Sequence, residues 1–472
     1  EAPFPSGPNA FAQIPCEKKY HLAQHEKTAG HMANLKRDKP STSKQPFLTT
    51  AFKDDRTNAF NVDLCEALVA ANIPWTKIRN PVLKRFLQKY CNHNVPSEST
   101  LRKNYLRPLY EQTLARIREE LGDSCIWISV DETTDVKGRF VAHFLAEKLA
   151  AHEKTRAFLV CPKPLERTNG EIVAFFVNES LKVLYPTGVK ATKVLLLYTD
   201  AAAYMHKAAH LMKAFYPQML HVTCLAHALH RVCEELRKHF TDVNELIGSA
   251  KAVFLKAPSR VRVFKEMLPD VPLPPEPVVT RWGTWLEAVE HYNCYLSDIK
   301  VVINGLPIDE GVAVTKVQAV LSVNSLPGDL AYLCDNFTFL TDPIKKLESA
   351  GETLVTNVAL ILHAQERIAT VPEGPVAEKA RAKLQSVLDK NKGFSVLKEA
   401  SEVLAGEHCR IPVSINPSNL PKYKYAPITS VDVERSFSAY KLILSDKRHN
   451  FEPGNLEMLV VTYCFYNFHS DS

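Results

Sequence analysis

Two short apolar runs, each followed closely by an aspartate, constrain the fold of this chain most strongly. The run at 125–130 is rich in β-branched residues and precedes Asp131, and the run at 193–198 ends two residues before Asp200. Runs of this length and composition are typical of buried strands. Residues just beyond the carboxyl ends of strands in α/β sheets face the ligand crevice. The sequence therefore predicts a sheet with Asp131 and Asp200 at its ligand-facing edge.

The other predicted elements follow the order of a mixed α/β domain. Further strands are predicted at 140–149, 157–160 and 220–223, and helices at 170–184 and 203–215, with a long helix ending at Phe240. Three strands followed by alternating helices and strands favour the α/β class, with a mixed sheet.

Helical spacing dominates the rest of the chain. Apolar residues fall at helical intervals over 58–120, where a long helix is predicted from Ser97 to Leu121. Few strand signals occur from about 244 to 425, so we expect a mainly helical insertion there. The C-terminal block, 428–468, is helical again, with a turn predicted at 452–454.

Composition excludes several classes of protein. The chain of 472 residues is long enough for several domains, and no run of about 18 apolar residues predicts a membrane span. Residues 1–10 lack the pattern of a secretory signal. The eleven cysteines are scattered, which favours a reducing compartment, the cytosol or nucleus. A formal net charge of +6 is compatible with nucleic-acid binding.

The two aspartates have the chemistry of a metal site. Asp131 and Asp200 could share hard divalent cations such as Mg²⁺ or Mn²⁺, which prefer oxygen ligands. Two such ions about 4 Å apart can activate a water or a 3′-hydroxyl for attack on a phosphate. Such a site normally needs a third carboxylate, and Glu434 is the candidate. An aspartate at a strand end is more often a cap or turn residue, and Glu132 or Asp135 could replace Asp131 as the ligand.

Two segments with histidine and cysteine are candidates for zinc. His25 and His31 have the spacing of the second half of a zinc finger, but of the first half only Cys16 remains. Three ligands do not close a structural zinc site, so this segment is predicted to be a degenerate or truncated finger. Cys224 and His227 also have ligand-like spacing, without an obvious second pair.

Three of five ordered motifs surround the predicted strand ends. The segment Asp131-Glu-Thr-Thr-Asp135 resembles the first acidic motif of the hAT superfamily of DNA transposases. The segment that begins at Asp200 resembles the second, with Ala201 in place of the usual Asn. Cys224-Leu-Ala-His227 resembles the Cys-x-x-His signature of the same superfamily.

The two remaining motifs lie beyond residue 244. Thr280-Arg-Trp282 resembles the Arg-Trp motif of the superfamily's insertion, and 430–438 with Lys441 resembles its C-terminal signature, which holds the last catalytic Glu. The helical stretch 61–105 is similar to the pre-catalytic region of the branch related to CGG-repeat-binding proteins.

The resemblance implies a ribonuclease-H-like core interrupted by an all-helical insertion. The core would hold Mg²⁺ or Mn²⁺ at Asp131, Asp200 and Glu434. With this metal site, the protein would cut transposon ends through a hairpin on the flanking DNA and join the freed 3′-hydroxyls to target DNA. Arg281 and Trp282 would stack on a base flipped out of the duplex. The other DNA-binding residues that it implies are His227, Lys207, Arg435 and Lys441.

The implied organisation has five parts: a finger-like segment and linker at 1–45, a helical DNA-binding or dimerisation region at 46–121, the first part of the core at 122–243, the insertion at 244–425, and the end of the core with a dimerisation region at 426–472. The implied partners are the terminal inverted repeats, target DNA and at least one further copy of the chain, in the nucleus. The alternative is a domesticated regulatory protein that binds DNA without catalysis. Intact acidic residues favour the enzyme, and the degenerate finger favours the alternative.

Overall fold

The computed structural model describes residues 49–275, 283–307, 311–349, 351–407, 410–446 and 448–468, with side chains from residue 58 onward. The chain divides into two compact units, Glu1–Ala59 and Phe60–Ser472. The first unit contains the predicted finger. Its candidate ligands Cys16, His25 and His31 lie outside the described residues, which begin at residue 49. The finer division into domains stays a prediction.

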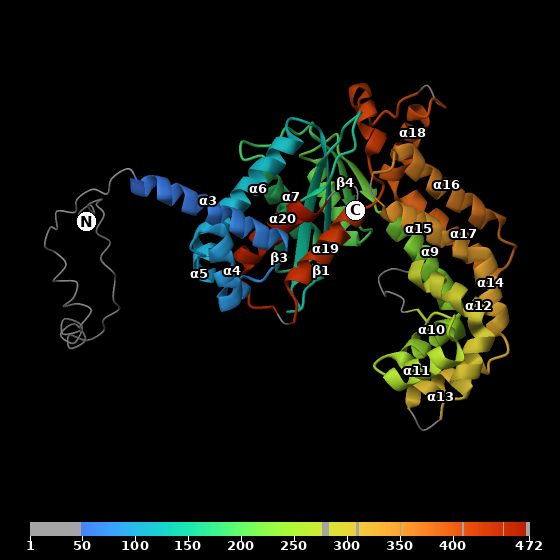
Figure 1. Cartoon of the computed structure of the whole chain (residues 1–472). Helices are drawn as coiled ribbons and strands as arrows, with labels where there is room; N and C mark the ends of the chain where they lie inside the picture. Colours follow the sequence, from blue (N-terminus) through green and yellow to red (C-terminus); the bar gives the residue numbers. More distant parts are fainter. Residues whose placement is uncertain are drawn as a thin grey trace, which may run out of the picture. The chain divides into compact units, whose positions relative to one another are not determined.

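The second unit contains a mixed five-stranded sheet in the order β3-β2-β1-β4-β5 (Figure 1). The strands are β1 (Ile126–Thr134), β2 (Phe140–Lys148), β3 (Phe158–Leu165), β4 (Val194–Thr199) and β5 (Leu220–Thr223). The first three strands pair antiparallel, whereas β4 is parallel to β1 and β5 is parallel to β4. The predicted mixed α/β class is therefore confirmed.

Helices precede, connect and follow the strands. Before the sheet lie α3 (Thr49–Ala70), η1 (Trp75–Arg79), α4 (Pro81–Cys91), α5 (Glu98–Thr100), η2 (Leu101–Tyr105) and α6 (Leu106–Leu121). The connecting helices are α7 (Gly170–Leu184), α8 (Ala203–Lys213) and α9 (Leu225–His239). The chain closes with α19 (Val431–Ile443) and α20 (Pro453–Asn467).

The long stretch between α9 and α19 is helical. Its helices are α10 (Thr241–Phe254), α11 (Pro258–Met267), α12 (Gly283–Asn304), α13 (Val312–Leu321), α14 (Leu326–Phe337), η4 (Thr338–Leu340), α15 (Thr341–Glu348), α16 (Leu354–Thr370), α17 (Pro375–Lys390), α18 (Lys392–Leu404) and η5 (Pro417–Tyr425). The described residues between 244 and 425 include no strand, as the helical spacing predicts. None of the described helices combines the length and apolar character needed to cross a membrane.

Two strands are longer than the sequence predicts. β1 continues through Asp131 to Thr134, because its antiparallel pairing with β2 extends to the Thr134–Phe140 pair. β3 continues past residue 160 through Pro162 and Pro164. Proline removes a backbone donor, and β3 accepts two of them because it is an edge strand with one unpaired side.

Alternating side chains of β1 enter two different cores. Ile126, Ile128 and Val130 pack with residues of α7, α8 and α20, whereas Trp127 packs with residues of α9 and the helical insertion. Successive strand residues point to opposite faces. The face of β1 that carries Trp127 therefore also carries Asp131.

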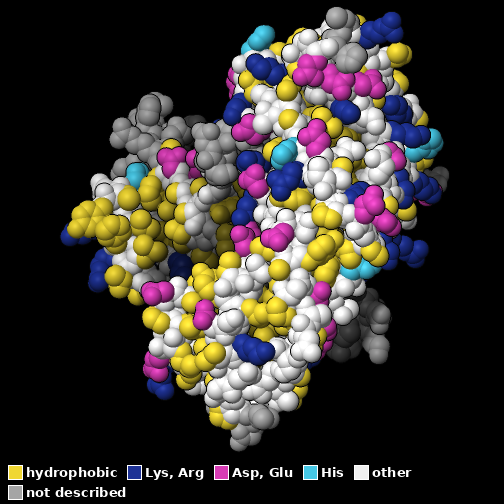
Figure 2. All heavy atoms as spheres, turned by 90° about the vertical axis from the view of Figure 1, so that its right-hand side faces the viewer, with side chains coloured by type: hydrophobic (Ala, Val, Ile, Leu, Met, Phe, Trp, Pro, Cys, Tyr) yellow, Lys and Arg dark blue, Asp and Glu magenta, His cyan; other side chains and the backbone are white. Residues whose placement is uncertain are grey.

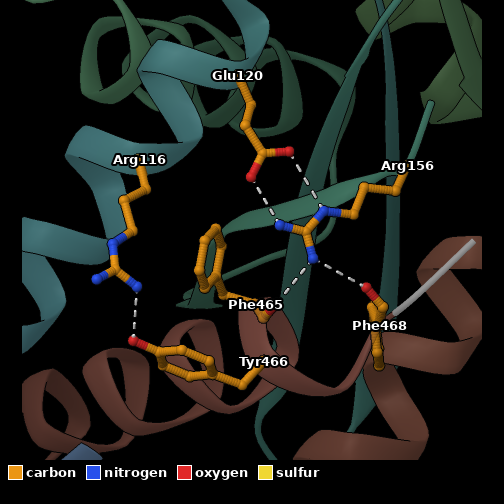
Figure 3. Close-up of polar contacts among 6 residues, drawn as sticks. All are labelled: Arg116, Glu120, Arg156, Phe465, Tyr466 and Phe468. Carbon is orange, nitrogen blue, oxygen red and sulfur yellow. Dashed lines mark hydrogen bonds and ion pairs between the residues drawn. The ribbon is translucent and has the colours of Figure 1, made fainter.

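Arg156 joins the edge of the sheet to the end of α20 (Figure 3). Its guanidinium donates to the carbonyl oxygens of Phe465 at 3.1 Å and Phe468 at 3.3 Å, and pairs with Glu120 of α6 at 2.7 Å. It also lies over the rings of Phe158 and Phe465. One side chain thus links α6, β3 and α20, which anchors the helix that follows α19.

We expect Arg156→Ala to lower the free energy of unfolding by about 2–3 kcal/mol, because hydrogen bonds to charged groups contribute about 1.5–3 kcal/mol. Arg116→Ala is the matched control, since Arg116 makes a single hydrogen bond to the Tyr466 hydroxyl at 3.2 Å. It should cost less than about 1 kcal/mol. Urea denaturation measures the free energy of unfolding of both variants, provided that its dependence on urea concentration is unchanged. Equal losses of this free energy in the two variants would contradict the anchoring role of Arg156.

Candidate active site

The sheet register brings Asp131 and Asp200 level with each other. Ser129 of β1 pairs with Tyr198 of β4 in parallel, and each aspartate lies two residues further along its strand direction. Burial, and then the negative charge of Asp200, raise the pKa of Asp131 well above its ordinary value. A carboxyl pair of this kind resists ionising fully, because two like charges repel at short range.

Each aspartate also accepts one backbone hydrogen bond. Asp131 Oδ1 accepts from the Glu132 N–H at 2.8 Å, and Asp200 Oδ1 accepts from the Ala202 N–H at 3.0 Å. The second bond holds the turn between β4 and α8. The capping interpretation of Asp200 is therefore partly correct, and it is compatible with a ligand role for the same carboxylate.

His227 connects the aspartates to Glu434. Its Nε2 lies 3.3 Å from Glu434 Oε1, and both side chains are partly exposed, by 32% and 25%. Burial disfavours the charged imidazole, but the negative charges of Cys224, Glu434 and Asp131 outweigh it and raise the pKa of His227. Burial alone would raise the pKa of the Cys224 thiol, yet the charge of His227 and hydrogen bonding lower it. The half-buried His227 imidazole is thus favoured in its charged form by the acidic groups around it.

Glu434 is positioned by contacts that fix α19 against the sheet. The Ser430 N–H, just before α19, lies 3.3 Å from Cys224 Sγ. Within the helix, Ser436 Oγ and His143 Nδ1 of β2 are 2.7 Å apart, and the His143 ring packs edge-on against Phe437. Burial, and secondarily Lys441, lower the pKa of His143 to about 3. A neutral histidine therefore fixes the helix that carries Glu434.

These contacts bring Asp131, Asp200, His227 and Glu434 into one region from four separate segments. The donor chemistry fits a divalent cation, because a pair of carboxylates whose repulsion raises a pKa supplies hard oxygen ligands. The third ligand is engaged elsewhere, since Glu434 pairs with His227. Within the described parts of the chain, no group of three or more His, Cys, Asp or Glu is arranged to hold a metal ion.

The alternatives to Asp131 have other contacts. Asp135 accepts backbone hydrogen bonds from Lys137 and Arg139 and pairs with the Arg139 guanidinium at 2.7 Å, so it stabilises the β1–β2 hairpin. Glu132 accepts a hydrogen bond from the Tyr204 hydroxyl. Burial, more than the charge of Asp200, raises the pKa of Glu132. Glu132 therefore lies at the border of the site.

The other residues predicted to bind DNA are less closely associated with the acidic site. Lys207 is exposed and pairs with Glu171 at 2.8 Å, and Lys441 is exposed on α19. Arg435 pairs with Asp432 at 2.8 Å and donates to the Glu348 carbonyl oxygen. Arg281 and Trp282 lie outside the described residues, so their base-stacking role stays a prediction.

Sequence reasoning missed two residues of the site. Tyr204 is the second residue of α8, four residues after Asp200, and its closeness in sequence to Asp200 could have drawn attention to it. His143 lies directly opposite Asp131 in the β1–β2 register, which the sequence alone does not reveal.

Comparison with known proteins gives one match. No curated protein matches the chain. Residues 96–253, about a third of the chain, match a family model described as a domain of unknown function (DUF659). That stretch covers all five strands together with Asp131, Asp200 and His227, but it ends before Glu434. Residues 96–253 are therefore similar to the DUF659 family, and the rest of the chain lies outside that match.

Proposed function

We propose that this protein is a DNA transposase of the hAT type with a ribonuclease-H-like core. The observation that carries the proposal is that His227 pairs with Glu434 and also lies within the electrostatic influence of Asp131, which is itself beside Asp200. The strand order β3-β2-β1-β4-β5 supports it, because Asp131 lies on the central strand β1 and Asp200 directly follows the neighbouring strand β4. The DUF659 region supports the transposase-like family.

In this proposal Asp131 and Asp200 hold Mg²⁺ or Mn²⁺, and Glu434 supplies the third carboxylate. A divalent cation bound there would activate an attacking water or 3′-hydroxyl and stabilise the leaving oxygen at a phosphate. His227 orients Glu434 and offsets part of the negative charge that a DNA phosphate would meet. Zn²⁺ is not part of the proposed site.

The finer proposal follows the resemblance of the motifs. The protein would cut transposon ends through a flanking hairpin and join the freed 3′-hydroxyls to target DNA. It would act in the nucleus as at least a dimer, because two ends must be processed together.

A second candidate is a DNA-binding regulatory protein without catalysis. One observation favours it: among the described residues, no three potential ligands are already arranged for a metal ion.

The experiment is a cleavage assay on a supercoiled plasmid that carries the DNA flanking the gene. A transposase should nick this plasmid with Mn²⁺ or Mg²⁺ and stop when a chelator is added. Binding without nicking under either metal would favour the regulatory protein. Nicking that persists in the chelator would contradict the proposed metal chemistry.

A further inference from the structure

A basic groove lies beside the candidate active site, between α8, β5 and the junction of α17 with α18. It is a hollow of about 480 Å³. Its basic and imidazole side chains are His206, His210, Lys213, His221, Lys390 and Lys392. None of the described residues that line this basic groove is an Asp or a Glu.

The insertion is fixed onto β5 by two close contacts. The Asn391 side chain accepts from the Thr223 N–H at 3.2 Å and donates to the Thr223 carbonyl oxygen at 2.7 Å. A Cβ at position 393 would overlap the carbonyl oxygen of His221, so the approach requires Gly393. Lys390 and Lys392 flank Asn391. These contacts therefore hold both lysines over the edge strand of the sheet.

The opposite wall of the basic groove is one face of α8. His206, His210 and Lys213 are spaced by four and three residues, which puts them on the same side of a helix. All three are exposed, as are Lys390 and Lys392. Lys213 donates to the Met219 carbonyl oxygen at 2.8 Å, but among the described residues no carboxylate pairs with any of the three lysines.

The basic groove gathers in one hollow three lysines that no carboxylate pairs with among the described residues. On the face drawn in Figure 2, Lys and Arg side chains are interspersed with Asp and Glu. Many exposed lysines of the chain are neutralised, for example Lys182 by Glu179 and Lys207 by Glu171. An uncompensated cluster in a hollow favours an anionic ligand with several charges.

The basic groove is connected to the strand end that carries Asp200. His221 Nε2 lies 2.8 Å from Thr199 Oγ1, and that hydroxyl donates to the Asp200 carbonyl oxygen at 2.6 Å. The ring of His206 packs edge-on against His221. α8 itself starts three residues after Asp200. A polymer that occupies the groove would therefore pass close to the acidic site.

We propose that the basic groove binds the phosphate backbone of a single DNA strand that leads to the Asp131–Asp200 site. The proposal rests on the proposed function, and it assigns a binding role to Lys213, Lys390 and Lys392. The seven residue steps from His206 to Lys213 rise about 10 Å along α8.

The test compares two double charge reversals. Lys390→Glu/Lys392→Glu alters the groove, and Lys300→Glu/Lys379→Glu is the matched control, with equal charge change at exposed lysines outside it. Binding of a fluorescent single-stranded DNA oligonucleotide is measured by anisotropy at several salt concentrations. Each lost phosphate contact lowers the slope of log K against log salt by about 0.7.

Raising the salt from about 50 to 200 mM lowers the DNA affinity of the wild type by some factor. For two lost contacts, we expect that factor to be about sevenfold smaller in the groove variant. The control variant should keep the wild-type slope. If the wild type binds DNA and the groove variant keeps its slope, the groove proposal is overturned and the proposed function stands. Failure of the wild type to bind DNA would overturn both.

Discussion

Replacing Asp131 with Asn will lower metal-dependent DNA cleavage by at least about 10³-fold. The expected loss exceeds the 10–100-fold typical of removing a residue that only orients a metal ligand. The same substitution should raise the thermal stability of the metal-free protein, because it removes a buried acid repelled by Asp200. Loss of activity together with gain of stability separates a functional carboxylate from a structural one.

The pH dependence of stability gives this prediction a definite sign. The folded state raises the pKa of Asp131 above its ordinary value of 3.8, so the folded chain binds its proton more tightly than the unfolded chain does. The contribution of Asp131 to stability is therefore lost as pH rises above 3.8 and the acid ionises. Thermal unfolding of Asp131→Asn should lack this component.

Asp123→Asn is the matched control for Asp131. Asp123 is exposed and pairs with Lys193 at 2.9 Å, away from the acidic cluster. It should leave cleavage unchanged and lower stability slightly, since exposed ion pairs contribute about 0–1 kcal/mol. A similar activity loss in both variants would remove the case for Asp131.

His227→Ala will reduce cleavage by about 10–100-fold, as expected for a residue that positions a ligand rather than supplying one. It removes the contact that holds Glu434 and the cation that lowers the pKa of Cys224. His227→Gln should recover part of the activity, because its amide can still donate to Glu434. If His227 had only a structural role, His227→Ala and His227→Gln would cleave DNA at the same rate when their stabilities are equal.

His239→Ala is the control for this series. His239 lies on the same helix and approaches a glutamate, Glu235, at 3.8 Å, but it is far along α9 from the site. Cleavage rates under saturating DNA should be unchanged. Full activity of His227→Ala would show that Glu434 does not depend on this histidine.

Local sequence patterns predicted much of the fold. The helix at 170–184 and the strand at 220–223 have the predicted bounds. The apolar runs predicted that Asp131 and Asp200 lie at neighbouring strands, although Asp131 lies within β1 and only Asp200 follows its strand. Strand ends were less predictable, since pairing with β2 extends β1 past Asp131.

Contacts between distant segments could not be predicted in this way. His143 meets Ser436 only because α19 packs on β2, and no local pattern of either segment indicates that contact. Asn391 and Thr223 likewise meet although 168 residues separate them in the sequence. The resemblance of the C-terminal motif, rather than spacing, made Glu434 the candidate for the third carboxylate.

The most direct test of the acidic cluster is its affinity for Mn²⁺, measured by the loss of the free-ion paramagnetic resonance signal on titration with protein. The wild type should bind Mn²⁺, Asp123→Asn should bind it equally, and Asp131→Asn/Asp200→Asn should not bind it at this site. Binding by the double variant equal to that of the wild type, or no binding by the wild type with DNA present, would contradict a metal-dependent active site at Asp131, Asp200 and Glu434.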